Sequence, residues 1–334
     1  MLRNARLTIL FTMAFLLFSS PCMAEMELQR PVASAIKAGE TELWGQLDYF
    51  SPRLDLTNYT GKLSTSSSLD RFTMESIGIH YGLPWNLNLR YAFGLMQEKV
   101  TRATEPRNIN TDAFMHDLRL QYLIHKESGL RIAGELGYLR HQAKAFDFYA
   151  FQFGGTVIRR KGRPFGTLTG KDQAWEAALR SAWKVNKDVW LHLSGELRRY
   201  KVEARMQSDD PLINLFFVPP IAPQKSPWRE THVLLQLGLD WQLSRNLKLL
   251  GDYAHTNITR SGYSPVAGKP DYRSQDQLDI YLSWQLTKGW NIYGHGRIYR
   301  HFVLGNLPMT YNQRTSHLFK HPFGMLSMGL SWSP

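Results

Sequence analysis

The chain has 334 residues and a formal net charge of +12, and it contains ten tryptophans, fifteen tyrosines and seventeen phenylalanines. This length allows two domains or one large barrel, and the basic balance would suit nucleic acid, anionic lipid or an acidic ligand. The single cysteine, Cys22, excludes an internal disulfide.

Residues 1–24 have the pattern of a cleaved secretory signal peptide. Arg3 and Arg6 form a basic start, a mostly apolar stretch follows, and Cys22-Met23-Ala24 is a small-x-small cleavage site. Pro21 stands where a lipoprotein signal has a small residue, so we disfavour a lipid-anchored cysteine. Cleavage lowers the formal net charge from +12 to +10, and export makes nucleic acid an unexpected partner.

No apolar run after the signal reaches the roughly 18 residues that a membrane-spanning helix requires. The exported chain is therefore soluble or a transmembrane barrel. Residues 25–41 carry no strong pattern, and we predict a periplasmic N-terminal tail with a short helix over 32–37.

Period-two alternation of apolar and polar residues begins at residue 42 and predicts β-strands. The twelve predicted strands are, in chain order, 42–51, 72–82, 87–99, 111–124, 130–144, 172–185, 189–205, 230–243, 247–259, 277–286, 290–299 and 322–333. The clearest hairpin lies at 277–299, where Leu278, Ile280 and Leu282 alternate with polar residues up to a tight turn. One of its faces is apolar and the other is polar and charged.

The connections alternate strictly between five short turns and six longer loops. An even number of strands with short connections at one rim and long ones at the other is typical of bacterial outer-membrane barrels. We therefore predict an all-β fold, a 12-stranded antiparallel transmembrane up-and-down β-barrel over 42–334, with short periplasmic turns and long extracellular loops. Apolar side chains would face lipid and polar ones the lumen.

Tryptophans near the short turns or the C-terminus support this arrangement, because amphipathic rings collect at a headgroup interface. The predicted periplasmic aromatic girdle comprises Trp85, Trp183, Trp241, Trp284, Trp290 and Trp332, with Trp190 beside them.

The signal peptide, the strand pattern and a last strand ending in the aromatic Trp332 together resemble Gram-negative outer-membrane β-barrels as a class. The resemblance covers 42–334 and implies insertion by the barrel-assembly machinery, with the N- and C-termini in the periplasm. The Ser333-Pro334 tail departs from the usual aromatic C-terminus. No particular family is identified, so no functional residues carry over.

Symmetric turns predict opposite charges on facing lumen positions, which stabilise hairpins. Arg119 would face Glu135, Glu176 would face Arg198, and Asp279 would face Arg297, while Arg180 lies one diagonal step from Glu196. The other predicted lumen charges are Arg90, Asp117, Arg131, Asp240, Lys248 and Asp252, together with Lys184. We favour salt-bridge networks over the alternative, a basic ladder of Arg90, Arg131, Arg180 and Lys248 that selects anions.

Two long loops are unusual. The loop 207–229 is apolar, and we predict that Leu215, Phe216, Phe217 and Val218 fold into the barrel mouth as a constriction. The loop 146–171 begins with alternating aromatics and continues with basic residues, which predicts a strand extension meeting lipopolysaccharide phosphates.

The sequence favours a narrow porin-like channel for small hydrophilic solutes, with anions as the class that a basic ladder would select. One alternative is a non-conducting barrel that acts as a surface receptor, an adhesin or a structural partner of an envelope export machine. A minor alternative is a lipid hydrolase using His192 and Ser194, which share one strand face. Against hydrolysis, that face is the lumen, and the residues predicted to face the pair include no acid. No cofactor and no metal site is expected.

Overall fold

The computed structural model describes residues 32–33, 36–51, 68–101, 109–153, 156–211, 227–262, 273–300 and 323–334. The predicted constriction residues Leu215, Phe216, Phe217 and Val218 lie outside this part of the chain. Among the described residues, no helix is long and apolar enough to cross a membrane.

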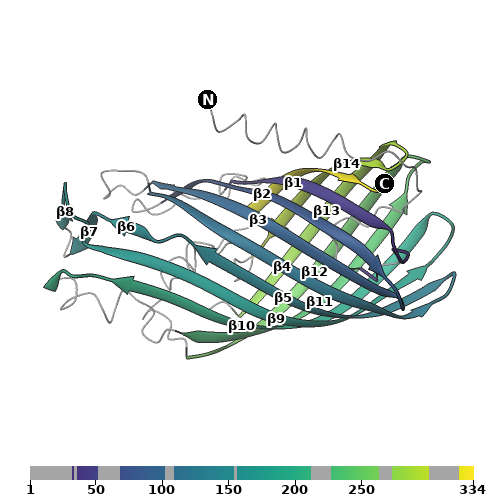
Figure 1. The fold of residues 1–334 in the computed structure, drawn as a ribbon, viewed down its shortest axis with the longest axis horizontal. Helices are drawn as coiled ribbons and strands as arrows, with labels where there is room; N and C mark the ends of the chain where they lie inside the picture. The colour runs from purple at the N-terminus through teal and green to yellow at the C-terminus, as the bar shows by residue number, and fades with distance from the viewer. Residues whose placement is uncertain are drawn as a thin grey trace.

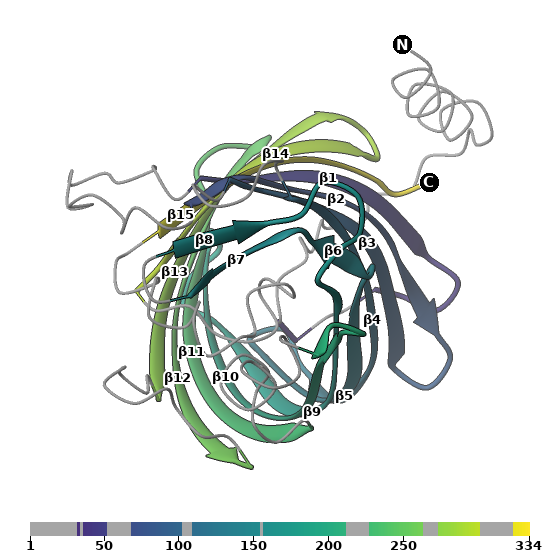
Figure 2. The ribbon, with the colours of Figure 1, turned by 90° about the vertical axis from the view of Figure 1, so that its left-hand side faces the viewer.

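Twelve long antiparallel strands close into a barrel, as predicted (Figures 1 and 2). These strands are β1 (Thr41–Ser51), β2 (Ser68–Leu83), β3 (Leu87–Thr101), β4 (Ile109–Lys126), β5 (Leu130–Ala143), β9 (Gly166–Lys184), β10 (Val189–Gln207), β11 (Trp228–Gln242), β12 (Leu247–Ser261), β13 (Ser274–Thr287), β14 (Trp290–Tyr299) and β15 (Phe323–Trp332). Neighbours along the chain pair with each other, and β1 pairs with β15 to complete the circle.

Side chains alternate between an apolar outer surface and a polar interior. Leu136 and Ile280 on the outside are 65% and 50% exposed, whereas the lumen-facing Arg180 is 0% exposed. This inside-out distribution is the one that lipid contact requires.

Several strands run further than their apolar pattern predicts. β4 begins at Ile109 and β9 at Gly166, two and six residues before the predicted starts at 111 and 172. The extra residues lie at the long-loop end of the barrel, where the strands no longer show the alternation of apolar and polar residues. Hydropathy therefore marks the lipid-facing band rather than the full length of the strands.

The loop 146–171 forms three short strands, β6 (Phe146–Phe148), β7 (Ala150–Phe153) and β8 (Thr156–Arg159). β6 prolongs the barrel wall by pairing with β9, which agrees with the predicted strand extension. β7 and β8 form a hairpin beyond the rim (Figure 1), and the end-on view places this hairpin across the barrel mouth (Figure 2). Arg160 forms an ion pair with Asp210, which ties this extension to the end of β10.

Two lumen aromatics lie directly over glycines of neighbouring strands. The Tyr293 ring occupies the place of a side chain at Gly329, where an added Cβ would lie 2.1 Å from the ring, and Trp44 covers Gly78 in the same way. The Tyr293 hydroxyl also donates a hydrogen bond of 2.9 Å to Gln46 on β1. Tyr293 thus links β14, β15 and β1 across the seam at which the barrel closes.

Val32 and Ala33 lie inside the barrel and are buried. The Gln121 side-chain amide donates a 2.7 Å hydrogen bond to the Val32 carbonyl oxygen. Ala33 packs in a cluster with Leu123, Ala133 and Ala182 of the wall, and Trp190 lies against them. The described residues 32–33 and 36–37 are not helical, so the short helix predicted over 32–37 is not observed there.

Candidate functional site in the barrel lumen

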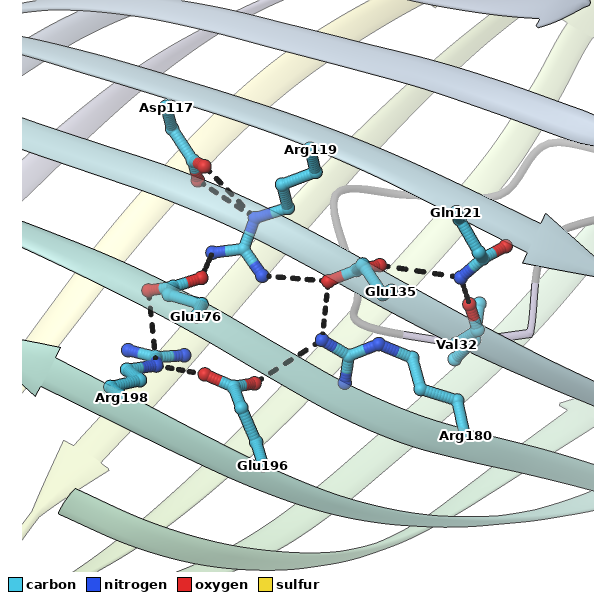
Figure 3. Close-up of polar contacts among 9 residues, drawn as sticks. All are labelled: Val32, Asp117, Arg119, Gln121, Glu135, Glu176, Arg180, Glu196 and Arg198. Carbon is cyan, nitrogen blue, oxygen red and sulfur yellow. Dashed lines mark hydrogen bonds and ion pairs between the residues drawn. The ribbon is translucent and has the colours of Figure 1, made fainter.

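A closed ring of alternating charges covers the lumen wall of β4, β5, β9 and β10 (Figure 3). Arg119 contacts Glu135 at 3.1 Å and Glu176 at 3.0 Å. Arg180 contacts Glu135 at 2.6 Å and Glu196 at 3.2 Å. Arg198 closes the ring through an ion pair with Glu196 and a 3.2 Å contact with Glu176.

The pairs of the ring follow largely from strand register. Arg198 faces Glu176 directly, and Arg180 faces Ser194, one diagonal step from Glu196, so both predictions are confirmed.

The register of the β4–β5 hairpin was predicted wrongly. Arg119 faces Gly137, and Gln121 takes the position opposite Glu135. The turn causes the shift, because the strands pair closer to it than predicted, with Lys126 opposite Arg131 and His125 opposite Ile132. The irregularity between Leu123 and His125 then offsets one residue of this shift. The long Arg119 side chain nevertheless reaches Glu135.

Two more charges extend the ring. The Arg119 Nε donates to Asp117 at 2.9 Å, and Arg90 faces Arg119 on the adjacent strand β3. Four arginines (Arg90, Arg119, Arg180, Arg198) and four carboxylates (Asp117, Glu135, Glu176, Glu196) thus lie in this part of the lumen. Such balance is what buried charges require, because an uncompensated charge pays a large desolvation cost. The bonds from Gln121 to Glu135 and to Val32 connect the ring to the N-terminal segment.

A second polar network lies on β13, β14, β15 and β1. Asp279 faces Arg297 as predicted and forms an ion pair with it. His295 Nε2 lies 2.6 Å from the same carboxylate, its ring stacks on Tyr281 at 3.9 Å, and its Nδ1 lies 3.4 Å from the Ser327 hydroxyl.

Asp48 of β1 is a fully buried carboxylate within this second network. Gln46 donates a 2.5 Å hydrogen bond to its Oδ1, while no described residue hydrogen-bonds its Oδ2. Sequence reasoning missed Asp48, although its position between the outward Leu47 and Tyr49 marks it as lumen-facing.

A cavity of about 250 Å³ separates the two networks and is lined by side chains from eleven of the twelve barrel strands. Its charged lining comprises Asp48, Asp117, Glu196, Asp252 and Asp279 with Arg90, Arg119, Arg198 and Arg297. Five carboxylates against four guanidinium groups leave the cavity close to neutral, with charges of both signs exposed to it.

The remaining predicted lumen charges lie nearer the short-turn rim. Lys248 contacts Asp240 at 3.2 Å, and the Arg131 guanidinium lies 4.6 Å above the Trp190 ring. Three of the four members of the postulated basic ladder are therefore engaged with acids or aromatics: Arg180 and Lys248 in ion pairs, and Arg131 with Trp190. This arrangement favours the paired network over a ladder of free cations.

His192 and Ser194 lie on the lumen face of β10, as predicted, and both are buried. The structure adds an acid that the sequence did not suggest, because His192 Nε2 lies 3.2 Å from Asp240 of β11. That pair was missed because a long loop, not a tight turn, connects β10 to β11, so the register between them is not readable from sequence. Ser194 faces the lumen and not the lipid-facing outer surface, which disfavours lipid hydrolysis.

Most predicted girdle tryptophans lie on the outer surface near the short turns. Trp85, Trp183, Trp241 and Trp284 are exposed, and Trp290 stacks on Trp332 at 5.8 Å. The placement of Trp190 with the girdle is wrong, because this residue shares the lumen face of His192 and packs beside Ala33 inside the barrel. Among the described residues, no group of three His, Cys, Asp or Glu side chains is arranged to hold a metal ion.

No protein-family model matches the chain, and no curated protein sequence matches it either. The translocator domain of the autotransporter NalP from Neisseria meningitidis is similar in structure, with a TM-score of 0.55, 10% identity and 88% of each chain covered. The β-domain of the Bordetella autotransporter BrkA gives a TM-score of 0.53 at 11% identity, covering 88% of this chain and 100% of that one. An outer-membrane channel from Pseudomonas putida F1 is more distant, with a TM-score of 0.44 at 10% identity, covering 92% of this chain and 100% of that one. At these identities the likeness concerns architecture alone, and the chain has the fold of a twelve-stranded outer-membrane β-barrel.

Proposed function

We propose that this protein is a narrow channel of the Gram-negative outer membrane that passes small hydrophilic solutes. The observation that carries the proposal is the mid-lumen cavity, which is lined by polar and charged side chains from almost every strand. A twelve-stranded barrel encloses more space than an eight-stranded one and less than a large porin, so only small solutes would pass. The short turns and both termini would face the periplasm, because the exposed tryptophans gather at that rim.

The paired charges argue for weak ion selectivity. A selective filter presents a ring of one sign, whereas this cavity presents five carboxylates and four guanidinium groups. Dipolar and uncharged solutes would pass as readily as anions. The anion preference that a basic ladder would give is therefore not part of the proposal.

Liposome swelling and planar-bilayer recording with the mature chain test the channel directly. We expect entry of small sugars, exclusion of large ones, and reversal potentials in a salt gradient that indicate little preference between anions and cations. The absence of both swelling and conductance would refute the proposal.

A second candidate function is a closed barrel that works as a surface receptor, an adhesin or a structural partner of export. It is favoured by the burial of Val32 and Ala33 within the lumen, where they take up space near the short-turn rim. One of the similar structures is the translocator domain of an autotransporter, but identities of 10% and 11% carry no activity over to this protein. A barrel that stays silent with and without its N-terminal segment would support this candidate.

A further inference from the structure

The outer surface of β5, β9, β10 and β11 changes abruptly from apolar to basic above the lipid-facing band. On β10 the outward residues from Val189 to Leu197 are uncharged, and Arg199 and Lys201 follow. That stretch is nine residues long, and a tilted transmembrane strand needs about 9–11 residues to cross the hydrocarbon core. The first basic residues therefore lie at the height of the lipid headgroups.

Five basic side chains form one patch at this height: Arg140, Lys171, Arg199, Lys201 and Arg229. Strand register places them side by side. Arg140 and Lys201 face Gln173 from its two sides, and Lys201 faces Arg229 directly. Lys171 and Arg199 occupy the next positions along β9 and β10, so the patch is continuous across four strands.

This patch holds more positive charge than its protein neighbours compensate. Glu203 forms ion pairs with Lys171 at 3.2 Å and with Lys201 at 2.9 Å. These contacts, chiefly the hydrogen bond from Lys201, hold the pKa of Glu203 below its usual range. Among the described residues, the acid of this patch, Glu203, contacts the two lysines, and no ion pair involves Arg199 or Arg229. Like charges on facing strand positions destabilise a sheet, so the juxtaposition of Lys201 and Arg229 favours an external anion.

Directly below the patch lie surfaces suited to acyl chains and to the interface. Trp175, 68% exposed, faces Arg199 on one side and Tyr138 on the other. Leu136, Leu197 and Val233 continue the apolar surface downward and are exposed. A phosphate-bearing lipid could therefore place its charges on the arginines and lysines while its chains cover the leucines and valine.

The two strands that follow β11 around the barrel lack these features. β12 and β13, both described along their whole length, carry no lysine or arginine at outward positions above Tyr253 and Leu278. The nearby Arg300 is engaged by Asp276 at 3.1 Å. In this direction around the barrel the basic patch thus ends at β11.

We propose that this basic patch is a binding site for a phosphorylated glycolipid of the outer leaflet, with lipid A phosphates held by Arg199, Lys201 and Arg229. The inference does not depend on conduction, because the patch lies on the outer surface. It requires only that the barrel stand in an asymmetric outer membrane with its short turns in the periplasm.

Native mass spectrometry of the mature protein in detergent micelles tests the site with three probes: diphosphoryl lipid A, dephosphorylated lipid A and phosphatidylglycerol. We expect diphosphoryl lipid A to bind most tightly. The variant Arg199→Gln/Lys201→Gln/Arg229→Gln should weaken its binding by about a hundredfold, because each basic residue near an anionic lipid surface contributes a factor of about five.

A matched control removes three exposed lysines at the short turns of the other rim, Lys126→Gln/Lys187→Gln/Lys288→Gln. It lowers the net charge equally and should leave lipid A binding unchanged. All six side chains lie outside the barrel core, so both variants should fold, which strand circular dichroism verifies. Equal weakening in the two variants, equal binding of phosphatidylglycerol, or full binding of dephosphorylated lipid A would each overturn the proposal.

Discussion

Asp279 on β13 and Arg297 on β14 face each other inside the barrel, and the same carboxylate lies 2.6 Å from His295 Nε2. A tight turn at residues 288–289 joins the two strands, with a register irregularity between Gln285 and Thr287, and the pair keeps the register that the sequence predicts.

Arg297→Met should lower the free energy of unfolding by about 2–4 kcal/mol, because it leaves the buried Asp279 carboxylate without its cation. Adding Asp279→Asn should recover part of that loss. Urea unfolding in lipid vesicles, followed by tryptophan fluorescence, measures both effects. Arg300→Met is the matched control: its ion pair with Asp276 is exposed, so the change should stay below about 1 kcal/mol. Additive effects of the two lumen substitutions would show that the pair is not coupled.

Arg180 is fully buried and holds both Glu135 and Glu196. Arg180→Gln should therefore leave net negative charge in the lumen and make an otherwise weakly selective channel prefer cations. Reversal potentials under a tenfold salt gradient measure the change. Lys187→Gln, at an exposed turn, removes the same charge without facing the lumen and should leave selectivity as it was. A variant of Arg180 that shifts toward anions would contradict the charge assignment of the ring.

Gly329 has no room for a side chain, because the Tyr293 ring lies where its Cβ would be. Gly329→Ala should impair closure of the seam between β14, β15 and β1 and destabilise the barrel by about 1–3 kcal/mol, the usual cost of overpacking. Heat-dependent mobility shifts of the folded barrel report the loss.

Gly296→Ala on the neighbouring strand is the control for Gly329, since its nearest atom to an added Cβ is 3.9 Å away. Tyr293→Ala combined with Gly329→Ala should restore space. If Gly329→Ala alone proves as stable as Gly296→Ala, the close contact with Tyr293 has no structural importance.

The N-terminal segment offers a test of gating. Deleting residues 25–33 removes Val32 and Ala33 from the lumen and should raise single-channel conductance if the barrel is a channel. Gln121→Leu loses the 2.7 Å hydrogen bond to the Val32 carbonyl oxygen. It should produce openings with the same raised conductance as the deletion variant, but of shorter duration. Lys37→Gln, which removes an exposed 3.5 Å ion pair with Glu40, should change neither. Identical conductance after the deletion would mean that the segment does not restrict the pathway.

The amino-acid sequence alone determined the strand number, the inside-out pattern and the facing pairs that tight turns fix. A period of two assigns each residue to a face, and a short turn leaves one register, so Glu176 with Arg198 and Asp279 with Arg297 were readable in advance. The β4–β5 prediction failed because the strands pair closer to their turn than expected, with Lys126 opposite Arg131, and the irregularity between Leu123 and His125 offsets only part of that shift.

Only the tertiary structure decided the contacts that cross long loops or the barrel seam. His192 meets Asp240 across the loop at 207–229, and Asp48 lies beside Ser327 because β1 pairs with β15 at the far end of the chain. Ring closure between Arg119 and Glu176 spans three strands, and the position of Val32 and Ala33 inside the lumen follows no strand rule. Long connections leave the relative shift of strands free, so the closed geometry of the barrel, rather than local pattern, selects these neighbours.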